Sequence, residues 1–529
     1  MRRSLLFNMT FVLLLLALLP GGMALAQEEN VLVIAIPGDI ETLDPPFSRF
    51  QRSNETNLNI YDQFFRYGSV DTGLGYSVAD TGTIEGAAVE SWEWSEDLSS
   101  IVLNIREGAT FNKSGREVTA DDFIYWFERA IGTASGTKWN VDTANIASWE
   151  KTGPHQVTLQ FSKLSPWLFF LFRDQSQGPM DAMEAQANVA DDDPWAARWL
   201  AKNDVGSGEY YVESWEPGVA MVLRANPDYW AGKAFFDQVV LQVVPSSADR
   251  ALLLREGEVD IAANLSTDEL AALEGAEGVK VLTVPTRNQM IMGLNVTGGP
   301  LADARVRQAL SYAVPYEDII AGIFSGKAKV SAGPIPVDGK HHDGSLWPYT
   351  YDPDKARELL AEAGYADGFE FTLDIASGVA TTEQIAVVLQ AAYADVGVTM
   401  NINLQTAAVF GEQLGTLGHE AWMRDLLWYV DDPGYTGVAT FRTGGITNWM
   451  GYSNARIDEL IEQMNGTLDE ELKAELAKEY QSIINEEAPQ LFLADMPFEL
   501  AMRDDIHGYV QLPDNLLWYW PLYRESMDG

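Results

Sequence analysis

The chain has 529 residues, a formal net charge of −42 and a pI of about 4.3, and it contains no cysteine. The length predicts two or three lobes rather than one core. The acidity argues against nucleic acid as a partner, because binding phosphates requires a basic face. Without cysteine the chain has no disulfides, no thiol catalysis, no cysteine-ligated metal and no lipid-modified cysteine to tether it to a membrane.

Residues 1–26 have the pattern of an export signal. Arg2 and Arg3 give a positive start, Leu5 to Leu19 form a short apolar run, and Ala24-Leu25-Ala26 is a small-x-small cleavage site. The run is shorter than the ~20 apolar residues that a membrane span requires. We therefore expect cleavage after Ala26 and a soluble protein held in the periplasm, with general or twin-arginine export both open.

The first part of the mature chain gives three different signals. Residues 31–37 (VLVIAIP) form a continuous apolar run, which predicts a buried strand. Residues 58–67 place apolar side chains at helical spacing. Residues 71–85 are rich in Gly, Thr and Ser and predict a loop.

A strand, a turn and a helix are expected between residues 86 and 131. Alternation over 101–105 predicts a half-buried strand. Thr119 can accept from the first helical turn and Asp122 can reach back, so the two form a capping box. Gly132 can end the helix, whose apolar face carries Phe123, Trp126, Phe127 and Ala130.

The rest of the chain alternates strands and helices without an apparent repeat. Asp303 and Asp352 are expected to cap helices, and Pro353 suits a first helical position. Strands are expected at 155–161, 210–215, 219–224, 236–244 and 369–375, and helices at 166–172, 301–315, 352–363, 382–396, 457–464 and 472–486.

Residues 92–130 (WEWSEDLSSIVLNIREGATFNKSGREVTADDFIYWFERA) closely resemble the signature region of the extracytoplasmic solute-binding proteins of family 5. These proteins serve peptide, nickel and oligosaccharide ABC importers. Residues 295–310, which include LADARVRQAL, and residues 351–364 (YDPDKARELLAEAG) match two further family blocks. Weaker matches, such as Leu43-Asp44-Pro45, extend the resemblance over nearly all of the mature chain.

The resemblance implies an α/β fold of the type II periplasmic-binding-protein kind, with two lobes, a hinge and an extra subdomain. The lobes of this family close over the solute between them. On this chain the expected division is a signal peptide at 1–26, lobe I at 27–62, 204–287 and 494–529, a subdomain of lobe I at 63–203, and lobe II at 288–493.

The resemblance also places the ligand contacts, on the segment before the Arg-Val-Arg-Gln helix and on the Asp-Pro segment of the second lobe. The candidate ligand-binding residues are Phe47, Arg287, Asn288, Gln289, Trp422, Trp428, Tyr429, Asp431 and Asp432. Arg287 suits a carboxylate because its guanidinium can bind bidentately. Core packing is the competing interpretation for each aromatic residue.

One residue departs from the pattern of the peptide binders. Four residues before Pro433, where those proteins hold a carboxylate for the peptide ammonium, this chain has Tyr429. Asp431 and Asp432 are the candidates to replace that carboxylate. Trp422, Trp428 and Tyr429 could instead stack on sugar rings, as in the oligosaccharide-binding branch of the family.

Motifs for chemistry are weak. The chain has no G-x-S-x-G elbow, and neither a phosphate loop nor a dinucleotide loop has its required spacing. His341-His342-Asp343 could hold a metal, although a solvated loop explains the same residues. We expect no catalytic residue, no cofactor and no resident metal.

These features predict a monomeric, non-enzymatic, periplasmic binding component of an ABC importer. Its partners would be a small solute and the permease and ATPase complex at the membrane, without nucleic acid. A peptide is the first expectation for the solute, an oligosaccharide the second and a nickel or other metal chelate the third. A secreted hydrolase is the alternative outside this class, and a chaperone or sensor use of the same fold stays open.

Overall fold

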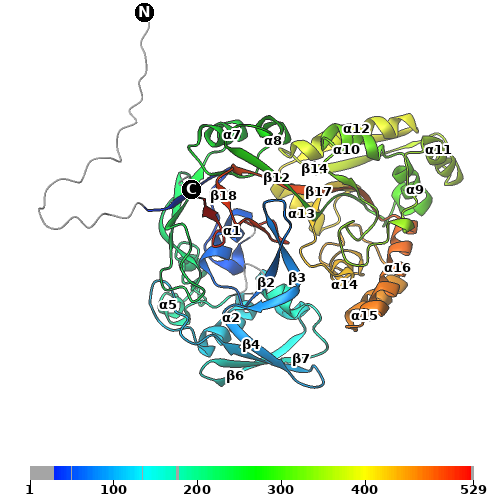
Figure 1. Ribbon diagram of the computed structural model, residues 1–529. Helices are drawn as coiled ribbons and strands as arrows, with labels where there is room; N and C mark the ends of the chain where they lie inside the picture. The colour runs from blue at the N-terminus through cyan, green and yellow to red at the C-terminus, as the bar shows by residue number, and fades with distance from the viewer. Residues whose placement is uncertain (1–28, 49–50, 134, 174–177, 526–529) are drawn as a thin grey trace, which may run out of the picture.

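A computed structural model of the chain describes residues 29–48, 51–133, 135–173 and 178–525 (Figure 1). The predicted signal segment, residues 1–26, lies outside these ranges. Within them, no helix combines the length and the apolar character that crossing a bilayer requires. The names lobe I, subdomain and lobe II are kept below for the residue ranges defined above.

One mixed sheet runs through both lobes and organises the fold. Its strands follow the order β15, β14, β16, β12, β17, β11, β1, β10, β9 and β8, and β13 adds to β17. Strands β1 and β10 pair in parallel, as do β14 and β15, whereas β12 and β17 are antiparallel. The bounds are Val31–Ile36 (β1), Tyr210–Glu216 (β8), Ala220–Ala225 (β9), Gln238–Val243 (β10), Ile261–Ala262 (β11), Val279–Leu294 (β12), Lys329–Val330 (β13), Phe369–Ala376 (β14), Val398–Gln405 (β15), Ala421–Leu427 (β16) and Gln490–Arg503 (β17).

The two long strands β12 and β17 connect lobe I with lobe II. They pair over most of their length, but the register breaks between Val284 and Asn288. Pro285 lies in this break and Pro497 lies opposite it. Because proline has no N–H to donate to a sheet, the ladder is interrupted where the lobes join, which is where a hinge needs freedom. The predicted lobe boundaries fall inside these two strands.

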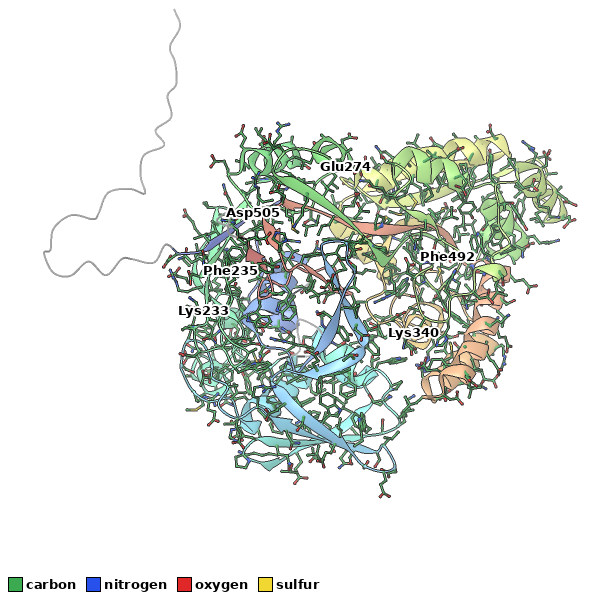
Figure 2. The ribbon with its side chains drawn as sticks, viewed as in Figure 1. Lys233, Phe235, Glu274, Lys340, Phe492 and Asp505 are labelled. Atoms are coloured by element: carbon green, nitrogen blue, oxygen red, sulfur yellow. The ribbon has the colours of Figure 1, made fainter. Side chains whose placement is uncertain are left out.

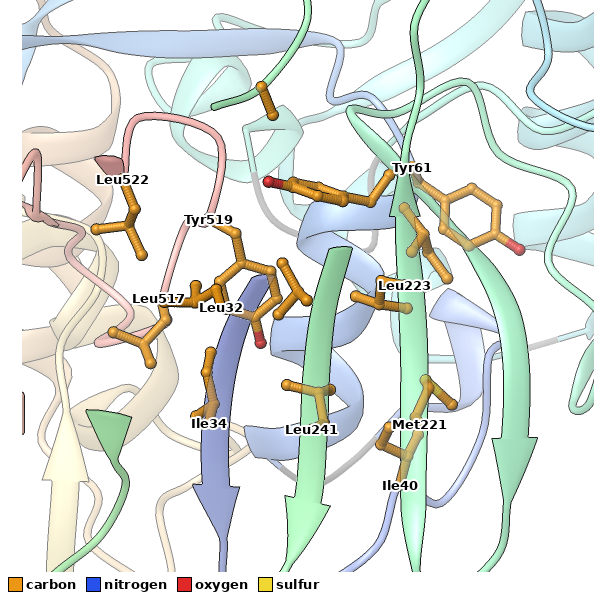
Figure 3. Close-up of a cluster of buried hydrophobic side chains, with 14 of the residues drawn as sticks. Leu32, Ile34, Ile40, Tyr61, Met221, Leu223, Leu241, Leu517, Tyr519 and Leu522 are labelled. Atoms are coloured by element: carbon orange, nitrogen blue, oxygen red, sulfur yellow. The ribbon is translucent and has the colours of Figure 1, made fainter. Parts of the chain in front are cut away.

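The core of lobe I brings together segments that are far apart in the sequence. Leu32 and Ile34 of β1 lie with Leu241 of β10 in one buried cluster, and Leu517 and Tyr519 return to it from near the C-terminus (Figure 3). The apolar run at residues 31–37 therefore contains a buried strand, β1, as its pattern predicts.

The subdomain packs a four-stranded antiparallel sheet, in the order β4, β5, β7 and β6, against helix α2 (Ala120–Thr133). Phe123 and Phe127 of α2 are buried with Phe64 and Phe172 in one aromatic cluster. Such ring pairs contribute about 0.5–1.5 kcal/mol each beyond the area that they bury. The strands are Val89–Trp94 (β4), Ser100–Ile105 (β5), Ile146–Gly153 (β6) and Gln156–Phe161 (β7), which confirms the predicted strand and the apolar helix face.

Two details of α2 differ from the expectation. Asp122 accepts from the Thr119 N–H at 2.9 Å, as in a capping box, but the Thr119 hydroxyl donates to the same carboxylate. The helix also continues past Gly132 to Thr133. A Cβ on Gly132 would lie 2.2 Å from the ring of Trp195. This glycine therefore permits a close approach instead of ending the helix.

A buried ion pair joins two of the motifs found in the sequence. Arg129 of α2 donates to both carboxylate oxygens of Asp44, at 2.8 and 2.6 Å, and the two side chains are 1% and 0% exposed. Burial raises the pKa of Asp44, and the charge of Arg129 opposes that rise. The bidentate geometry holds the Leu-Asp-Pro element against the signature helix.

Two expected elements near the N-terminus are wrong. Helical spacing predicts a helix over 58–67, but α1 (Gln51–Ile60) ends at Ile60 and β2 (Phe65–Asp71) follows. The expected loop at 71–85 contains β3 (Ser77–Gly86), which pairs with β2 and with β19 (Val510–Gln511). Pairing with the far end of the chain outweighs the low strand propensity of Gly and Ser, because strand propensity depends strongly on context.

Helices cover the sheet of lobe II (Figure 1), and their predicted caps are confirmed. Asp303 accepts from the Arg305 N–H, and Asp352 accepts from the Lys355 N–H with Pro353 at the first helical position. Figure 2 places Phe492 in this lobe. The helices are Ala304–Tyr312 (α9), Tyr316–Ile323 (α10), Pro353–Glu362 (α11), Ala380–Asp395 (α12), Ala407–Gly415 (α13), Pro433–Thr436 (α14), Ala455–Asn465 (α15) and Glu470–Glu487 (α16).

The remaining elements are short or lie at the edges of the lobes. A π-helical turn covers Gly437–Phe441 in lobe II, directly after α14. The other elements are Gly136–Thr143 (α3), Leu168–Phe172 (α4), Ala182–Ala187 (α5), Ala197–Leu200 (α6), Ser247–Glu256 (α7), Thr267–Leu273 (α8), Ile506–His507 (β18), Tyr523–Arg524 (β20) and the 3-10 turns at Pro45–Phe47, Pro300–Ala302 and Gly344–Leu346.

Candidate ligand-binding site

Trp428 and Gln289 lie together beside the hinge, directly after β16 and within β12. The Trp428 Nε1–H donates to Gln289 Oε1 at 2.8 Å, and the Gln289 amide donates to Ser331 and Asp495. Gln289 is 0% exposed and Trp428 is 5% exposed. Burial raises the pKa of Asp495, and its hydrogen bonds oppose that rise. The polar side-chain atoms of both predicted residues are thus hydrogen-bonded to other protein groups, so these residues hold the local structure together.

Asp432 has two structural roles. Its Oδ1 accepts from the Gly434 N–H at 2.8 Å and so caps α14, and its Oδ2 lies 2.8 Å from Lys473 Nζ. The side chains of Asp432 and Lys473 are 10% and 4% exposed. Both oxygens of this carboxylate already accept hydrogen bonds within the protein, so Asp432 has less acceptor capacity left for a ligand ammonium than an unpaired carboxylate would have.

Arg287 and Asp431 bring opposite charges together beside Trp428. Arg287 Nη1 lies 3.6 Å from Asp431 Oδ2, and its Nε donates to the Trp428 carbonyl at 3.0 Å. Asp431 also accepts from the Lys340 N–H at 2.8 Å, and Figure 2 shows Lys340 in lobe II.

Arg287 also borders a small cleft of about 110 Å³, between β3 and the C-terminal segment. This volume suits water or one small group rather than a whole solute.

Asn288 has only one of its two polar side-chain atoms paired among the described residues. Its Nδ2 donates to Asp425 at 3.1 Å, and its buried Oδ1 has no partner among the described residues.

The two histidines of the candidate metal motif have separate partners. His341 Nε2 lies 3.0 Å from Glu470, and His342 Nδ1 lies 3.0 Å from the Ile335 carbonyl. Within the described ranges, no three His, Asp or Glu side chains converge as a metal site would require.

Two of the predicted aromatic residues lie apart from the others. Trp422 is 0% exposed, and its indole N–H donates to the Trp449 carbonyl. A Cβ on Gly293 would lie 2.2 Å from the Trp422 ring. Trp422 is therefore a core residue, and the expectation that it stacks on a sugar is wrong. Phe47 is half-buried beside Arg129, whose guanidinium carbon lies 5.8 Å from the Phe47 ring centre.

Tyr429 connects the predicted site with the subdomain. The Tyr435 hydroxyl donates to the Tyr429 hydroxyl at 2.6 Å. The ring of Tyr435 meets Trp139 and Trp167 edge-on, with centroids 5.8 and 5.7 Å apart. These three rings, called the aromatic contact below, join lobe II to the subdomain through an arrangement that aromatic quadrupoles favour.

A cleft of about 980 Å³ opens between the subdomain and lobe II beside the aromatic contact. The subdomain wall includes Trp139, Lys163 and Trp167, and the lobe II wall includes Arg442 and Glu462. This volume is at the upper end of the range for small-molecule sites. We call this space the interlobe cleft.

The sequence profile of the family described as bacterial extracellular solute-binding proteins, family 5, matches residues 83–448. The chain belongs to this family. The match contains both the signature helix and the Arg-Val-Arg-Gln block, so the resemblance stated from these motifs is confirmed.

Curated relatives of this solute-binding protein match along nearly the whole chain. The probable D,D-dipeptide-binding periplasmic protein DdpA of Escherichia coli K12 is 26% identical, and the alignment covers 97% of this chain and 98% of that protein. Heme-binding protein A of Haemophilus influenzae is also 26% identical, with 90% and 88% covered. The ligands in these names differ, so family membership alone leaves the solute open.

Solved structures show the same fold. The periplasmic binding protein DppA from Helicobacter pylori, in complex with the peptide STSA, superposes with a TM-score of 0.81 at 24% identity and covers 94% of this chain and 99% of its own. MoaA from A.tumefacien R10, in complex with mannopinic acid, gives 0.80 at 22% identity and covers 94% and 100%. These similarities confirm the expected type II binding-protein fold.

In this solute-binding protein the interlobe cleft includes residues that the sequence did not single out. Lys163 and Trp167 follow strand β7, and Arg442 begins the loop after the π-helical turn. No motif marks these positions, and the glycines that follow Arg442 are a weak signal for a binding loop. The arrangement can hold a solute with both apolar and charged groups between two bodies that a hinge connects.

Proposed function

We propose that this protein binds a peptide between its lobes and delivers it, chemically unchanged, to the permease and ATPase of an ABC importer. It acts in the periplasm as a monomer after removal of its signal segment. DdpA is named as a dipeptide-binding protein, and the DppA structure holds a tetrapeptide, which supports a peptide for this chain. The candidate residues of the site form no nucleophile and base pair that would suggest hydrolysis.

The observation that carries this proposal is the interlobe cleft, which lies between two bodies that an interrupted pair of long strands joins. The register of β12 and β17 breaks at Pro285, and the cleft of about 980 Å³ lies between the subdomain and lobe II. A solute that contacts both walls binds the closed arrangement better than an open one, and so shifts the protein toward closure. Closure is the change that a permease can recognise.

An oligosaccharide is the second candidate for the solute, because Trp139 is half-buried on the wall of the interlobe cleft. A ring in this position can stack on a sugar face. Trp422 cannot contribute to such a site, since it lies in the core. The charged residues Lys163, Arg442 and Glu462 on the walls of the cleft favour a peptide over a neutral sugar.

Native mass spectrometry of protein purified without refolding tests the proposal. We expect a mass excess that disappears on denaturation, together with released peptides whose masses do not change when they are incubated with the protein. Released sugars without peptides would overturn the assignment of the solute. Peptides that the protein cleaves would overturn the assignment as a binding protein. If the protein is purified empty, calorimetric titration with mixed tetrapeptides replaces this test, and an absence of binding would overturn the proposal.

A further inference from the structure

The two walls of the interlobe cleft carry charges that the protein leaves open. Lys163 on the subdomain and Arg442 on lobe II are exposed and form no ion pair among the described residues. Glu462 of α15, on the lobe II wall, likewise has no ion pair within the described ranges. The cleft therefore offers two cations and one carboxylate to a bound molecule.

The other acidic residues of the cleft are already engaged. Asp142 pairs with Lys138 at 2.5 Å, and Glu459 pairs with an arginine of its own helix at 2.7 Å. Asp458 accepts from the N–H and the hydroxyl of Thr443, at 2.8 and 2.7 Å. These bonds reduce the repulsion that the carboxylates would exert on an incoming anion. The open groups that remain match a zwitterion better than a simple anion.

A residue of the same cleft wall carries a buried, unsatisfied donor. Trp167 is 4% exposed, and its Nε1–H has no acceptor among the described residues. A buried donor without a partner costs free energy that an acceptor on a ligand restores. Asn465, on the lobe II wall, likewise has a buried Oδ1 without a partner. Both walls therefore leave hydrogen-bonding capacity for a ligand that carries acceptors and donors, as a peptide backbone does.

We infer that the interlobe cleft holds the carboxylate end of the peptide, with Lys163 and Arg442 binding the carboxylate and the Trp167 N–H donating to a peptide oxygen. This inference rests on the proposed function. Arg442 suits the role because a guanidinium binds a carboxylate with two parallel hydrogen bonds. Because the two cations stand on opposite walls, the carboxylate links the subdomain to lobe II. The aromatic contact already joins these two bodies at the edge of the cleft.

Calorimetric titration with the tetrapeptide STSA, as the free acid and as the C-terminal amide, tests the inference. The wild-type protein should bind the free acid about tenfold or more tightly than the amide. The double variant Lys163→Gln/Arg442→Gln should lose that preference, because its affinity for the free acid falls to that for the amide. The matched control is Lys202→Gln/Arg255→Gln, which makes the same charge change at two exposed residues outside the cleft. This control should keep the preference.

The outcomes separate the two proposals. If the wild type binds both forms equally, or if the double variant keeps the preference for the free acid, the carboxylate assignment is wrong and the peptide-binding function stands. If the wild type binds neither form of STSA nor either form of a mixed tetrapeptide pool, the peptide-binding function is wrong and the carboxylate assignment fails with it. Thermal unfolding of each variant without peptide checks that the substitutions leave the fold intact, as expected for exposed side chains.

Discussion

The residues around Trp428 and the walls of the interlobe cleft adjoin each other at Tyr435, but their polar groups are paired in different ways. Beside the hinge, Trp428 donates to Gln289, and Asp432 binds both a helix N-terminus and Lys473. Across the cleft, Lys163 and Arg442 have no ion pair within the described ranges. Gln289, Trp428 and Asp432 therefore have their polar atoms paired without a ligand, whereas the side chains of Lys163 and Arg442 do not.

This difference shows how a binding residue can be told from a structural one. A side chain whose hydrogen bonds end within the protein must break them to bind a ligand, which costs most of what it gains. An unpaired polar atom is not sufficient evidence either, because Glu209 Oε2 also lacks a partner among the described residues. The useful signal combines an unpaired group with a cleft large enough to hold a ligand.

The largest expected effect comes from breaking the paired region at Asp432. Asp432→Ala should destabilise the protein by about 3–5 kcal/mol, because it leaves Lys473 as a buried, unpaired charge and removes a helix cap. Urea denaturation measures this change. Asp354→Ala is the matched control, since its side chain is 97% exposed in a surface pair with Arg357. The control should change stability by about 0.5 kcal/mol or less.

The same variant tests whether Asp432 is a structural residue or a ligand contact. If Asp432 is structural, the Asp432→Ala protein that remains folded should bind peptide with nearly unchanged affinity. A large loss of affinity without a loss of stability would show that Asp432 is a ligand contact after all.

The second prediction concerns a buried carboxyl group that pairs with Arg66 through one oxygen, has no partner for its other oxygen among the described residues, and lines no described cleft. Glu209 is fully buried beside Arg66 and Asp62, and burial raises its pKa from 4.5 to about 7. Between pH 4.5 and about 7 the unfolded chain ionises this carboxyl while the folded protein keeps it protonated. The contribution of Glu209 to stability is therefore fully present below pH 4.5 and is lost as the pH rises through about 7.

Glu209→Gln should remove this pH dependence. Between pH 4.5 and pH 7.5 the wild type should lose stability relative to the variant, by an amount on the order of 3 kcal/mol at most. Urea denaturation at several pH values measures the difference, and Glu258→Gln at an exposed position is the control. Parallel pH profiles for the wild type and Glu209→Gln would show that Glu209 is ionised in the folded protein.

The third prediction concerns the hydrogen bond from Trp428 to Gln289. Trp428→Phe keeps an aromatic ring but removes the indole N–H, so Gln289 Oε1 loses its donor. The cost should be about 1–3 kcal/mol of stability, since that oxygen is fully buried. Trp215→Phe is the control, because its indole donates to Asp39 at a half-buried position where water can replace it. If Trp428→Phe weakens peptide binding strongly at unchanged stability, Trp428 belongs with the cleft residues instead.

Much of the fold was predictable because local signals agreed with the final packing. The caps at Asp303 and Asp352 and the buried strand at 31–36 each depend on neighbours in sequence. Strand β3 was missed because its partners are β2 and the distant β19, and no local pattern reports such pairing. Gly132 was misread for a related reason, since its role depends on Trp195 from another segment.

The site was less predictable than the fold. Motif resemblance led to the segment that contains Trp428 and Asp432, which does lie beside the interlobe cleft through Tyr435. It gave no information on which side chains are already paired, because pairing with Lys473 or Gln289 is a tertiary property. Trp422 shows the same limit, since its aromatic ring fits a sugar site and a core equally well until burial is known.

The smallest expected effect lies at the boundary between the two regions, where Tyr435→Phe removes the hydroxyl that donates to Tyr429 and keeps the ring that meets Trp139 and Trp167. The stability should fall by about 1 kcal/mol, the usual net value of one hydrogen bond. Peptide affinity should change less than in Tyr435→Ala, which also removes the aromatic contact and so weakens the closed arrangement. Paired calorimetric titrations of the two variants measure this. If Tyr435→Phe lowers affinity as much as Tyr435→Ala does, then the hydrogen bond between Tyr435 and Tyr429 stabilises the closed arrangement more than the aromatic contact does. The residues around Trp428 and the interlobe cleft would then act as one site.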